Sequence, residues 1–408
     1  MINGKPIIAH QLDEAIKLNI KNVYVLLGYK GDLIELFVNK NYSSFFKLVF
    51  ITEKIPLGTA GAIKQLEGLI SDRFMVFYSD TIFNINLMQF IEFDKKQDSI
   101  GSLISHPNDH PFDSDLIETD ESNKIIKFHL YPHDKSIYLA NNVSAALYIL
   151  SPTIFNYITK NQFSDLTKNI FTKILENESL FAYKTIEFIK DIGTPERINY
   201  VRKLFRRNRK NHLPLKSKVV FLDRDGVINV EKDNLSSINQ LELIEGASEA
   251  IRLLNQNNFL VIIVTNQPQV AKGFLSFKNL KLIHNKLEHL LGIDRAYVDD
   301  IFYCPHHPEV GFNNEVKSLK IKCKCRKPET GMLLQAKTKY NIDFSLSWMI
   351  GDRYCDVEAG FRVGSKTILV KTGLSGNDKL YFQNTNPDFI FQDIKEAVNY
   401  ILTTYDNN

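Results

Sequence analysis

Short apolar runs alternate with amphipathic segments along the first 80 residues of the chain. An apolar run of this length predicts a buried strand, and an amphipathic segment predicts a helix. In chain order the predicted elements are a helix at 7–18, a strand at 22–27, a helix at 31–39, a strand at 46–52, a helix at 59–70 and a strand at 73–79. Strands and helices that alternate in this way are typical of a parallel, Rossmann-like α/β sheet.

A second alternation begins near residue 218. The apolar runs at 219–222 and 259–264 predict buried strands, the segment at 245–257 predicts a helix, and a further strand begins at Trp348. The pattern therefore predicts a second α/β domain with its own parallel sheet.

The stretch from 202 to 218 separates the two alternations. It is rich in Lys and Arg and is interrupted by Asn208, Asn211 and Pro214. A basic run can mark an anion-binding patch, but we interpret this one as a solvated helix end followed by a linker. The sequence thus predicts a first domain at 1–210, a linker at 211–217 and a second domain at 218–402.

Composition narrows the class of protein. A chain of 408 residues with 44% apolar and 24% charged residues suits two or three globular domains. The net charge of +3 is too small to argue for nucleic acid or an anionic membrane as partner. No apolar run approaches the roughly 20 residues of a membrane helix, and the N-terminus has no signal-peptide pattern. We therefore expect a cytoplasmic protein.

A pair of aspartates follows the first strand of the second domain. Asp223 ends the strand, Asp225 follows two positions later, and Gly226 allows the backbone to turn. Carboxylates at i and i+2 beyond a parallel strand lie at the sheet edge where α/β proteins bind ligands. Two carboxylates so close need a cation or a proton between them, so they predict a Mg²⁺ site with one carboxylate free to act as nucleophile. An aspartate-rich turn is the alternative reading.

Other polar residues follow later strands of this domain. Thr265 and Asn266 end one strand, and Asp352 and Asp356 follow another. A hydroxyl and an amide at such a strand end can bind phosphate oxygens, although the same residues are also common turn formers.

Three of the four cysteines lie within 22 positions, which favours a metal site over a disulfide framework and fits a reducing compartment. Cys304 and His306 form Cys-x-His, and Cys323 and Cys325 form Cys-x-Cys. Three thiolates and one imidazole are a full tetrahedral set for Zn²⁺, so we expect a structural zinc. His307 is a weaker candidate because its side chain should point away from its neighbour.

The residues Arg326-Lys327-Pro328 follow the last of these cysteines directly. A loop that a metal pins in place and that carries two cations suggests a rigid clamp for a phosphorylated substrate.

The first domain has weaker candidates. Gly58 and Thr59 lie between a strand and a helix, where backbone N–H groups suit a nucleotide base or a phosphate. Asp80 follows a strand, and Asp191 precedes a helix that should run to about Arg207. Each of these features is also common in turns that only cap an element.

Taken in order with the segment Ile2-Asn-Gly-Lys-Pro-Ile, these features resemble the sugar-phosphate nucleotidyltransferases over about residues 1–200, with heptose-1-phosphate nucleotidyltransferases as the nearest group. The resemblance implies a mixed sheet, with Asp80 and Asp191 as Mg²⁺ carboxylates. It also implies that Gly58 and Ala60 line a base pocket. The stretch His106-Pro-Asn-Asp-His-Pro and the pair Asn141-Asn142 would fall on the sugar side.

The sequence departs from that family at its start. Family members open with a strand, a Gly-rich loop with Thr-Arg and a Pro-Lys-Pro segment, and the sequence printed here begins after all of them. We therefore expect a domain that lacks its nucleotide loop and does not transfer nucleotides. The alternatives are a working bifunctional enzyme whose true start lies upstream, and a non-catalytic binding module that could support self-association.

The second domain has four motifs in a recognisable order: Asp-x-Asp-Gly at 223–226, Thr-Asn at 265–266, Arg-Lys-Pro at 326–328 and Gly-Asp-x-x-x-Asp at 351–356. With them the domain resembles the haloacid dehalogenase (HAD) phosphohydrolases from 218 to about 375. The Cys/His set is similar to that of the zinc-loop heptose bisphosphate phosphatases. This resemblance implies removal of the 7-phosphate of D-glycero-D-manno-heptose 1,7-bisphosphate, in nucleotide-heptose synthesis for lipopolysaccharide or other surface glycans.

The resemblance also assigns the chemistry. Asp223 would attack the phosphate and form an aspartyl-phosphate, and Asp225 would act first as general acid and then as general base. Asp223, the backbone carbonyl of Asp225, and Asp352 would hold Mg²⁺.

The remaining motif residues would bind or orient the substrate. Thr265 and Lys327 would contact the phosphoryl oxygens, with Asn266 as a further candidate, and Arg326 would grip the second phosphate. Asp356 would orient Lys327 or a metal-bound water. One departure from the phosphatases is Pro-Gln after Asn-Gln at 266–269, where they usually have Ser-Gly, so a related zinc-loop enzyme such as a histidinol-phosphate phosphatase stays an alternative.

Overall fold

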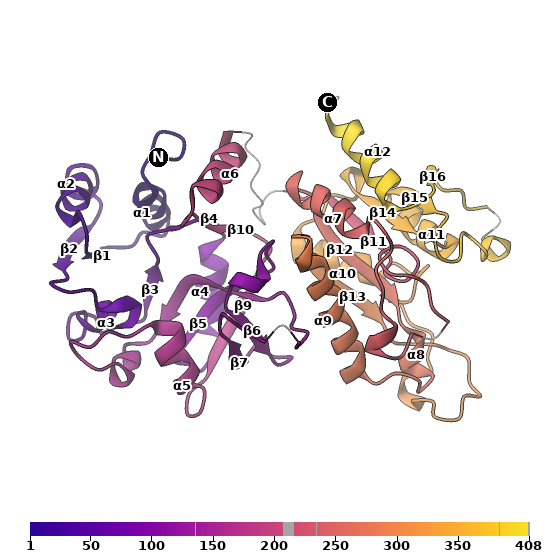
Figure 1. Ribbon diagram of the computed structural model, residues 1–408, viewed down its shortest axis with the longest axis horizontal. Coiled ribbons are helices and arrows are strands. Elements are labelled where there is room, and N and C mark those ends of the chain that lie inside the picture. The colour runs from indigo at the N-terminus through magenta and orange to yellow at the C-terminus, as the bar shows by residue number, and fades with distance from the viewer. Residues whose placement is uncertain (135, 207–215, 234, 383, 407–408) are drawn as a thin grey trace. The chain divides into compact units, whose positions relative to one another are not determined.

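The computed structural model describes residues 1–134, 136–206, 216–233, 235–382 and 384–406. The chain divides into two compact units (Figure 1). One comprises Met1–His106, Asp115–Tyr131 and Val143–His212, and the other comprises Pro107–Ser114, Pro132–Asn142 and Leu213–Asn408. The predicted linker at 211–217 lies mostly outside the described residues, so the predicted domain boundaries stay a prediction.

The first unit alternates helices and strands through most of its length. Its elements are α1 (Ile7–Lys17), β1 (Asn22–Leu27), α2 (Gly31–Tyr42), β2 (Lys47–Thr52), α3 (Gly58–Lys64), β3 (Phe74–Phe77), β4 (Thr81–Asn84), α4 (Leu87–Lys95), β5 (Gly101–His106), β6 (Leu116–Thr119), β7 (Ile125–His129), β8 (Val143–Leu150), α5 (Thr172–Ile174), β9 (Leu180–Lys184), β10 (Phe188–Asp191) and α6 (Pro195–Arg206).

The sheets of this unit are mixed. β1 and β2 pair in parallel, and a larger sheet has the order β7-β6-β8-β5-β9, in which β5 and β9 are parallel and the other pairs antiparallel. β3 pairs with β8 in antiparallel orientation, and β4 pairs with β10. The mixed sheet implied by the family resemblance is confirmed. A single parallel sheet over 22–79 is wrong, because β3 takes a partner from much later in the chain, which a local pattern does not report.

One predicted helix is too long. The helix expected at 59–70 ends at Lys64, and the chain continues in turns to Gly68, which has a φ of +81°. Ile63 and Leu66 are nevertheless both buried in the same core cluster. The apolar spacing therefore reports burial correctly, although only its first part is helical.

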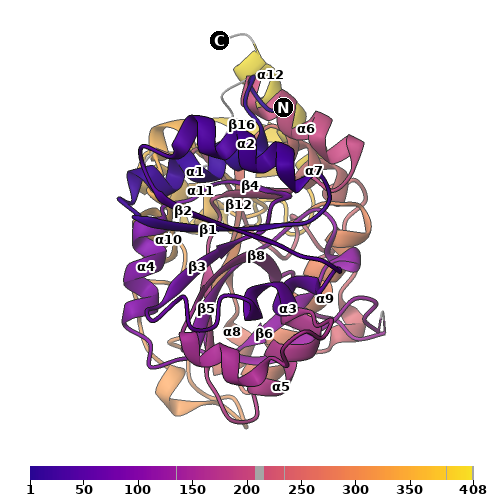
Figure 2. The ribbon, with the colours of Figure 1, turned by 90° about the vertical axis from the view of Figure 1, so that its left-hand side faces the viewer.

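Helices cover both faces of the β1–β2 pair. Figure 2 shows α1 and α2 on one side of these strands and α3 on the other. Val23, Leu48 and Phe50 pack with α1 and α2, whereas Tyr24 and Leu26 pack with the cluster that contains α3. This is the alternation expected of strands buried on both faces.

The second unit is built on one parallel sheet. Its elements are β11 (Val219–Leu222), α7 (Ala247–Gln256), β12 (Leu260–Asn266), α8 (Pro268–Ala271), α9 (Phe277–Ile293), β13 (Asp300–Cys304), α10 (Gly331–Tyr340), β14 (Trp348–Gly351), α11 (Tyr354–Val363), β15 (Lys366–Val370), β16 (Phe389–Phe391) and α12 (Ile394–Asp406).

The strands of this sheet lie in the order β13-β12-β11-β14-β15-β16, and every neighbouring pair is parallel. Side chains from α7, α9 and α12 form the core on one face, together with Val220, Leu222 and Ile263. On the other face the ring of Phe221 lies near that of Phe344, with 6.1 Å between the centroids, and α10 and α11 contact β13 and β14. The predicted parallel sheet is therefore confirmed, with β11 between two parallel neighbours. None of the helices in the described ranges is long and apolar enough to span a membrane.

Candidate active site and metal-binding clusters

The carboxylates of the second unit converge at the carboxyl ends of β11 and β14. These strands are parallel neighbours, with Leu222 paired to Ile350, so the residues that follow them meet at one edge of the sheet. Oxygens of Asp223, Asp352 and Asp356 lie within 4.8 Å of one another, and all three residues are buried. The strand-end prediction thus places three carboxylates in one small volume.

A buried lysine lies among them. The Nζ of Lys327 is 2.8 Å from Oδ1 of Asp223 and 2.6 Å from Oδ1 of Asp356, and its side chain is 1% exposed. Burial alone would lower the pKa of Lys327, but the charges of Asp223 and Asp356 outweigh it and raise the pKa. The lysine therefore stays charged, and it joins the predicted nucleophile to the last aspartate of the motif.

One ammonium does not balance three carboxylates. Burial, together with the charges of Asp223 and Asp356, raises the pKa of Asp352 to about 8. Burial also raises the pKa of Asp356 to about 6, although Lys327 opposes the shift. The site as built favours a further positive charge beside Asp352.

The donor set fits Mg²⁺. Oδ2 of Asp352 accepts a hydrogen bond from the backbone N–H of Leu374 at 2.7 Å, whereas its buried Oδ1 has no hydrogen-bond partner among the described residues. Gly226 has a φ of +80°, and a Cβ there would lie 2.3 Å from Oδ2 of Asp352, so only glycine allows this close approach. Carboxylate and backbone oxygens are the ligands that Mg²⁺ prefers.

Asp225 lies outside this carboxylate cluster and is held by its own network. Nη2 of Arg224 donates to both of its oxygens at 2.8 and 2.7 Å, Nδ2 of Asn229 donates at 3.0 Å, and Nε2 of Gln267 donates at 2.9 Å. Burial would raise the pKa of Asp225, but the charge of Arg224 and these hydrogen bonds outweigh burial and lower it.

The sequence analysis missed Arg224, Asn229 and Gln267. One signal was available, because Arg224 is a charged residue at the end of a fully apolar strand, and it is 0% exposed. A buried arginine requires a buried acceptor, and the adjacent aspartate is the nearest candidate.

Thr265 and Asn266 have different hydrogen-bond partners. Nδ2 of Asn266 donates to the carbonyl of Lys327 at 3.1 Å, and Oδ1 of Asn266 accepts from the backbone N–H of Lys327 at 3.0 Å. Oγ1 of Thr265 accepts from Nε2 of Gln267 at 2.8 Å. In this structure Asn266 therefore orients the backbone of the lysine, which differs from the predicted contact with phosphate.

Further cations lie around the zinc-loop residues. Nη1 of Arg326 donates to the carbonyl of His306 at 3.4 Å. The Nζ atoms of Lys272 and Lys320 lie 5.0 and 4.6 Å from the centroid of the Phe312 ring. Burial lowers the pKa of Lys272, the charges of Arg326 and Lys320 lower it further, and Glu309 opposes them. Lys272, Lys320 and Arg326 thus form a basic cluster, and Arg326 directly precedes Lys327 in the chain.

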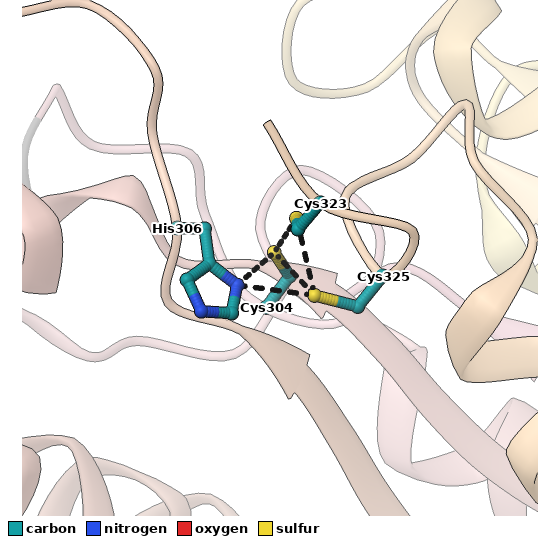
Figure 3. Close-up of side chains that lie close together, drawn as sticks. All are labelled: Cys304, His306, Cys323 and Cys325. Carbon is teal, nitrogen blue, oxygen red and sulfur yellow. Dashed lines mark hydrogen bonds between the residues drawn. The ribbon is translucent and has the colours of Figure 1, made fainter. Parts of the chain in front are cut away.

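The Cys/His set comes together as the spacing predicts (Figure 3). Sγ of Cys325 lies 3.1 Å from Sγ of Cys304, 3.2 Å from Sγ of Cys323 and 3.2 Å from Nδ1 of His306. Side chains from β13 and the later loop thus point at one central position. The chemistry of three thiols and an imidazole at these separations fits tetrahedral Zn²⁺. The neighbouring His307 instead approaches Glu309, with 3.8 Å between Nε2 and Oε2.

The candidates of the first unit are not assembled in this way. Asp80 is exposed in the turn after β3, and Asp191, at the end of β10, forms an ion pair with Arg197 at 2.5 Å. The register places Asp191 opposite Thr81, the residue after Asp80. Among the described residues of this unit, no three carboxylate, histidine or cysteine groups are close enough to hold a metal ion together.

The predicted base and sugar residues of the first domain are used within the chain. The carbonyl of Ser164 accepts from the N–H groups of Ala60 at 2.8 Å and Gly61 at 3.3 Å, so the start of α3 is already capped. Nδ2 of Asn141 donates to the carbonyl of Asn108 at 2.7 Å. A role of Gly58 and Thr59 in binding a base or a phosphate stays a prediction.

In the second unit, a parallel doubly wound sheet carries a buried Asp-Lys-Asp cluster at its carboxyl edge. Together with the Asp-x-Asp-Gly turn, these features define a phosphohydrolase of the HAD class. A family model described as HAD-hydrolase-like matches residues 324–397, and one described as nucleotidyl transferase matches residues 1–205. The chain belongs to the nucleotidyl transferase family through its first half, which is fused to a HAD-like phosphatase domain.

The curated relatives support the second assignment. The D-glycero-beta-D-manno-heptose-1,7-bisphosphate 7-phosphatase of Haemophilus ducreyi is 39% identical over 158 residues, which cover 38% of this chain and 84% of the relative. The D-glycero-alpha-D-manno-heptose-1,7-bisphosphate 7-phosphatase of Photorhabdus laumondii is 39% identical over 159 residues, which cover 39% of this chain and 85% of the relative. The predicted family is confirmed for both halves of the chain.

Two solved structures are also similar. The D,D-heptose 1,7-bisphosphate phosphatase from B. bronchiseptica, solved with magnesium and phosphate, is 30% identical with a TM-score of 0.41, and the match covers 46% of this chain and 99% of that chain. HddC from Yersinia pseudotuberculosis, solved with GMP-PN, is 25% identical with a TM-score of 0.42, and the match covers 50% of this chain and 88% of that chain.

Proposed function

We propose that the second domain hydrolyses the 7-phosphate of D-glycero-D-manno-heptose 1,7-bisphosphate through an aspartyl-phosphate. The observation that carries this proposal is the buried Asp223, whose carboxylate is paired with Lys327 at 2.8 Å and lies within 4.8 Å of a carboxylate oxygen of Asp352. A carboxylate that is paired with an ammonium group can act as a nucleophile toward a phosphorus atom. The relatives that cover this domain are named for that reaction.

In the first step an oxygen of Asp223 attacks the 7-phosphorus, and the bond from phosphorus to the sugar oxygen breaks. The departing sugar oxygen takes a proton from Asp225, which must have bound that proton beforehand. In the second step Asp225, now a carboxylate, removes a proton from water, and the hydroxide attacks the phosphorus and releases Asp223 with inorganic phosphate. The donors around Asp225 favour its charged form, the form in which it accepts a proton from water in the second step; the first step requires it to bind a proton against this preference.

Asp223, the backbone carbonyl of Asp225, and Asp352 would hold Mg²⁺. When bound, this ion offsets negative charge on the transferring phosphoryl group. Lys327 lies between Asp223 and Asp356, so its ammonium can contact a phosphoryl oxygen while Asp356 keeps it in place. Thr265 offers a hydroxyl, and Asn266 fixes the backbone of Lys327.

The zinc cluster has four protein ligands and no position for a substrate, so its role is structural. It fixes the loop that carries Arg326 and Lys327. Arg326, with Lys272, would bind the second phosphate of the substrate, because guanidinium and ammonium groups bind phosphate strongly.

The product of this reaction keeps its anomeric phosphate, which is the group that a sugar-phosphate nucleotidyltransferase joins to a nucleotide. The fusion to a nucleotidyl transferase family domain therefore fits a place in nucleotide-heptose synthesis for lipopolysaccharide or other surface glycans. The free thiols of the cluster fit a reducing compartment such as the cytoplasm.

The deciding experiment measures phosphate release by the purified full chain with Mg²⁺. The substrates are the α and β anomers of heptose 1,7-bisphosphate, histidinol phosphate and a generic aryl phosphate. Selective release from one heptose anomer is expected, and it would also assign the anomer. Activity restricted to histidinol phosphate would keep the HAD chemistry and reject the heptose.

A further inference from the structure

The segment from Thr372 to Asp378, after β15, contacts both parts of the proposed Mg²⁺ site. Oγ1 of Thr372 donates to the carbonyl of Gly226 at 2.6 Å. Two residues later the backbone N–H of Leu374 donates to Oδ2 of Asp352 at 2.7 Å, and the N–H of Gly376 donates to the carbonyl of Asp352 at 2.7 Å. One short segment thus joins the turn after β11 to the residue after β14.

The contact with Gly226 bears on a proposed metal ligand. The N–H of Gly226 donates to the carbonyl of Asn229 at 2.8 Å. In a planar trans peptide the carbonyl of Asp225 points away from that N–H, so this bond fixes one side of the Asp225–Gly226 peptide. Thr372 fixes the next peptide along the chain, and the two bonds together set the direction of the Asp225 carbonyl.

The segment that contains Gly373 packs so closely against Gly226 and Asp352 that a larger side chain would not fit. Gly373 has a φ of +59°, and a Cβ there would lie 2.3 Å from Oδ2 of Asp352 and 2.6 Å from the Cα of Gly226. The segment is also anchored at its far end, because Asp378 accepts from the N–H groups of Tyr354 at 2.7 Å and Cys355 at 3.1 Å at the start of α11. Contacts at both ends of the segment therefore hold it against Asp352.

We propose that Thr372 is a positioning residue for the Mg²⁺ site, acting through its hydrogen bond to the Gly226 carbonyl. This inference rests on the proposed assignment of the metal to Asp223, the Asp225 carbonyl and Asp352. The hydroxyl of Thr372 bonds the carbonyl of Gly226, which is not one of the proposed metal ligands. It selects the orientation of a backbone ligand, and Leu374 does the same for the Asp352 carboxylate. Residues that orient metal ligands typically contribute about 10- to 100-fold in metal affinity.

The test measures Mg²⁺ binding to the full chain, freed of Mg²⁺ but loaded with zinc, by titration calorimetry. Thr372→Val removes the hydroxyl with little change in volume, Thr372→Ala is a second loss variant, and Thr372→Ser keeps the hydroxyl. The matched control is Thr338→Val, which removes an exposed hydroxyl-to-carbonyl hydrogen bond within α10. Asp352→Asn should lose the proposed Mg²⁺ site, so the difference from the unaltered protein gives the binding heat of that site.

We expect the dissociation constant for Mg²⁺ to rise about tenfold in Thr372→Val and Thr372→Ala and to stay within about twofold in Thr372→Ser and Thr338→Val. In the variants that bind Mg²⁺ more weakly, the unfolding temperature of the Mg²⁺-free protein should change little, which would show that the fold is intact. Unchanged Mg²⁺ affinity in both loss variants would overturn the proposal, as would an equal loss in Thr372→Ser.

Activity then separates this inference from the proposed reaction. At saturating Mg²⁺ the KM for the phosphorylated substrate should be unchanged in Thr372→Val, and the Mg²⁺ concentration for half-maximal rate should rise in parallel with the dissociation constant. If no heptose bisphosphate is hydrolysed by the unaltered protein but the binding differences persist, the proposed function fails and the role of Thr372 stands.

Discussion

Aspartates follow strands in both halves of the chain, yet their surroundings differ. In the second unit Asp223, Asp352 and Asp356 are buried close together, and Asp223 and Asp356 share Lys327 as a partner. In the first unit Asp80 is exposed and Asp191 forms a partly exposed ion pair. A carboxylate in water costs little to ionise, whereas a buried one requires a compensating charge. A reactive carboxylate site thus depends on burial and unbalanced charge in addition to position after a strand.

The backbone N–H groups near the candidate sites also have different partners in the two units. At the start of α3 the N–H groups of Ala60 and Gly61 are taken by the carbonyl of Ser164. In the second unit the N–H of Leu374 is aimed at a carboxylate whose other oxygen has no partner among the described residues. A donor paired with a backbone carbonyl closes a turn, whereas the donor at Leu374 orients a carboxylate that we propose as a Mg²⁺ ligand.

Replacing one aspartate in each unit tests this difference most directly. Asp223→Asn should lower phosphate release by at least about 10⁴-fold, because an amide cannot form the covalent intermediate. The matched variant Asp80→Asn should leave the rate unchanged. Both are compared in a steady-state phosphate assay, with circular dichroism as the check on folding. Normal turnover by Asp223→Asn would remove the nucleophile from the proposed mechanism.

Loss of zinc should have the next largest effect, and again only in the second unit. Cys325→Ser removes one of four ligands directly before Arg326 and Lys327, so these cations should lose their fixed position. We expect bound zinc to fall from about one per chain to a small fraction, with phosphatase activity reduced about 10- to 100-fold. Elemental analysis measures the metal content.

The control for zinc content is Cys355→Ser, since Cys355 is a buried cysteine outside the cluster. It should retain the metal. Equal zinc loss in both variants, or none in Cys325→Ser, would contradict the assignment of the four ligands.

The pH dependence of stability should separate the two units in the metal-free protein. The folded-state pKa of Asp352 is raised from 3.8 to about 8, so the folded state binds this proton more tightly than the unfolded chain. Its contribution to stability therefore falls as the pH rises from about 4 to about 8. Mg²⁺ replaces the proton, so it should raise the unfolding temperature of the second unit by about 5 °C or more at pH 8 and by less at pH 5.

Differential scanning calorimetry with and without Mg²⁺ measures both effects. The transition of the first unit serves as an internal control and should not respond to Mg²⁺ in the same way. A larger Mg²⁺ shift at pH 5 than at pH 8 would show that Asp352 does not carry the excess negative charge.

The sequence predicted the parts of the site that depend on strand ends and short spacings. Asp223 and Asp352 could be placed together because carboxyl ends of parallel strands share one edge, and the Cys/His set because its spacing suits one metal. The antiparallel pairing of β3 with β8, the early end of α3 and the segment at Thr372 could not be predicted. Each of them depends on contacts between residues far apart in the chain, which leave no periodic signal.

The smallest effect on activity that we predict compares two aspartates that each pair with an arginine, Asp225 in the second unit and Asp191 in the first. Nε2 of Gln267 donates to both Asp225 and Thr265, so Gln267→Leu should leave Asp225 with fewer donors and less tightly positioned. A displaced acid–base group lowers the turnover number more than it changes substrate binding, so kcat should fall about tenfold at constant KM. By contrast, Arg197→Met breaks the partly exposed pair with Asp191, which should cost less than about 1 kcal/mol and leave phosphatase kinetics unchanged. Equal kcat values for the two variants would mean that the buried network does not position Asp225.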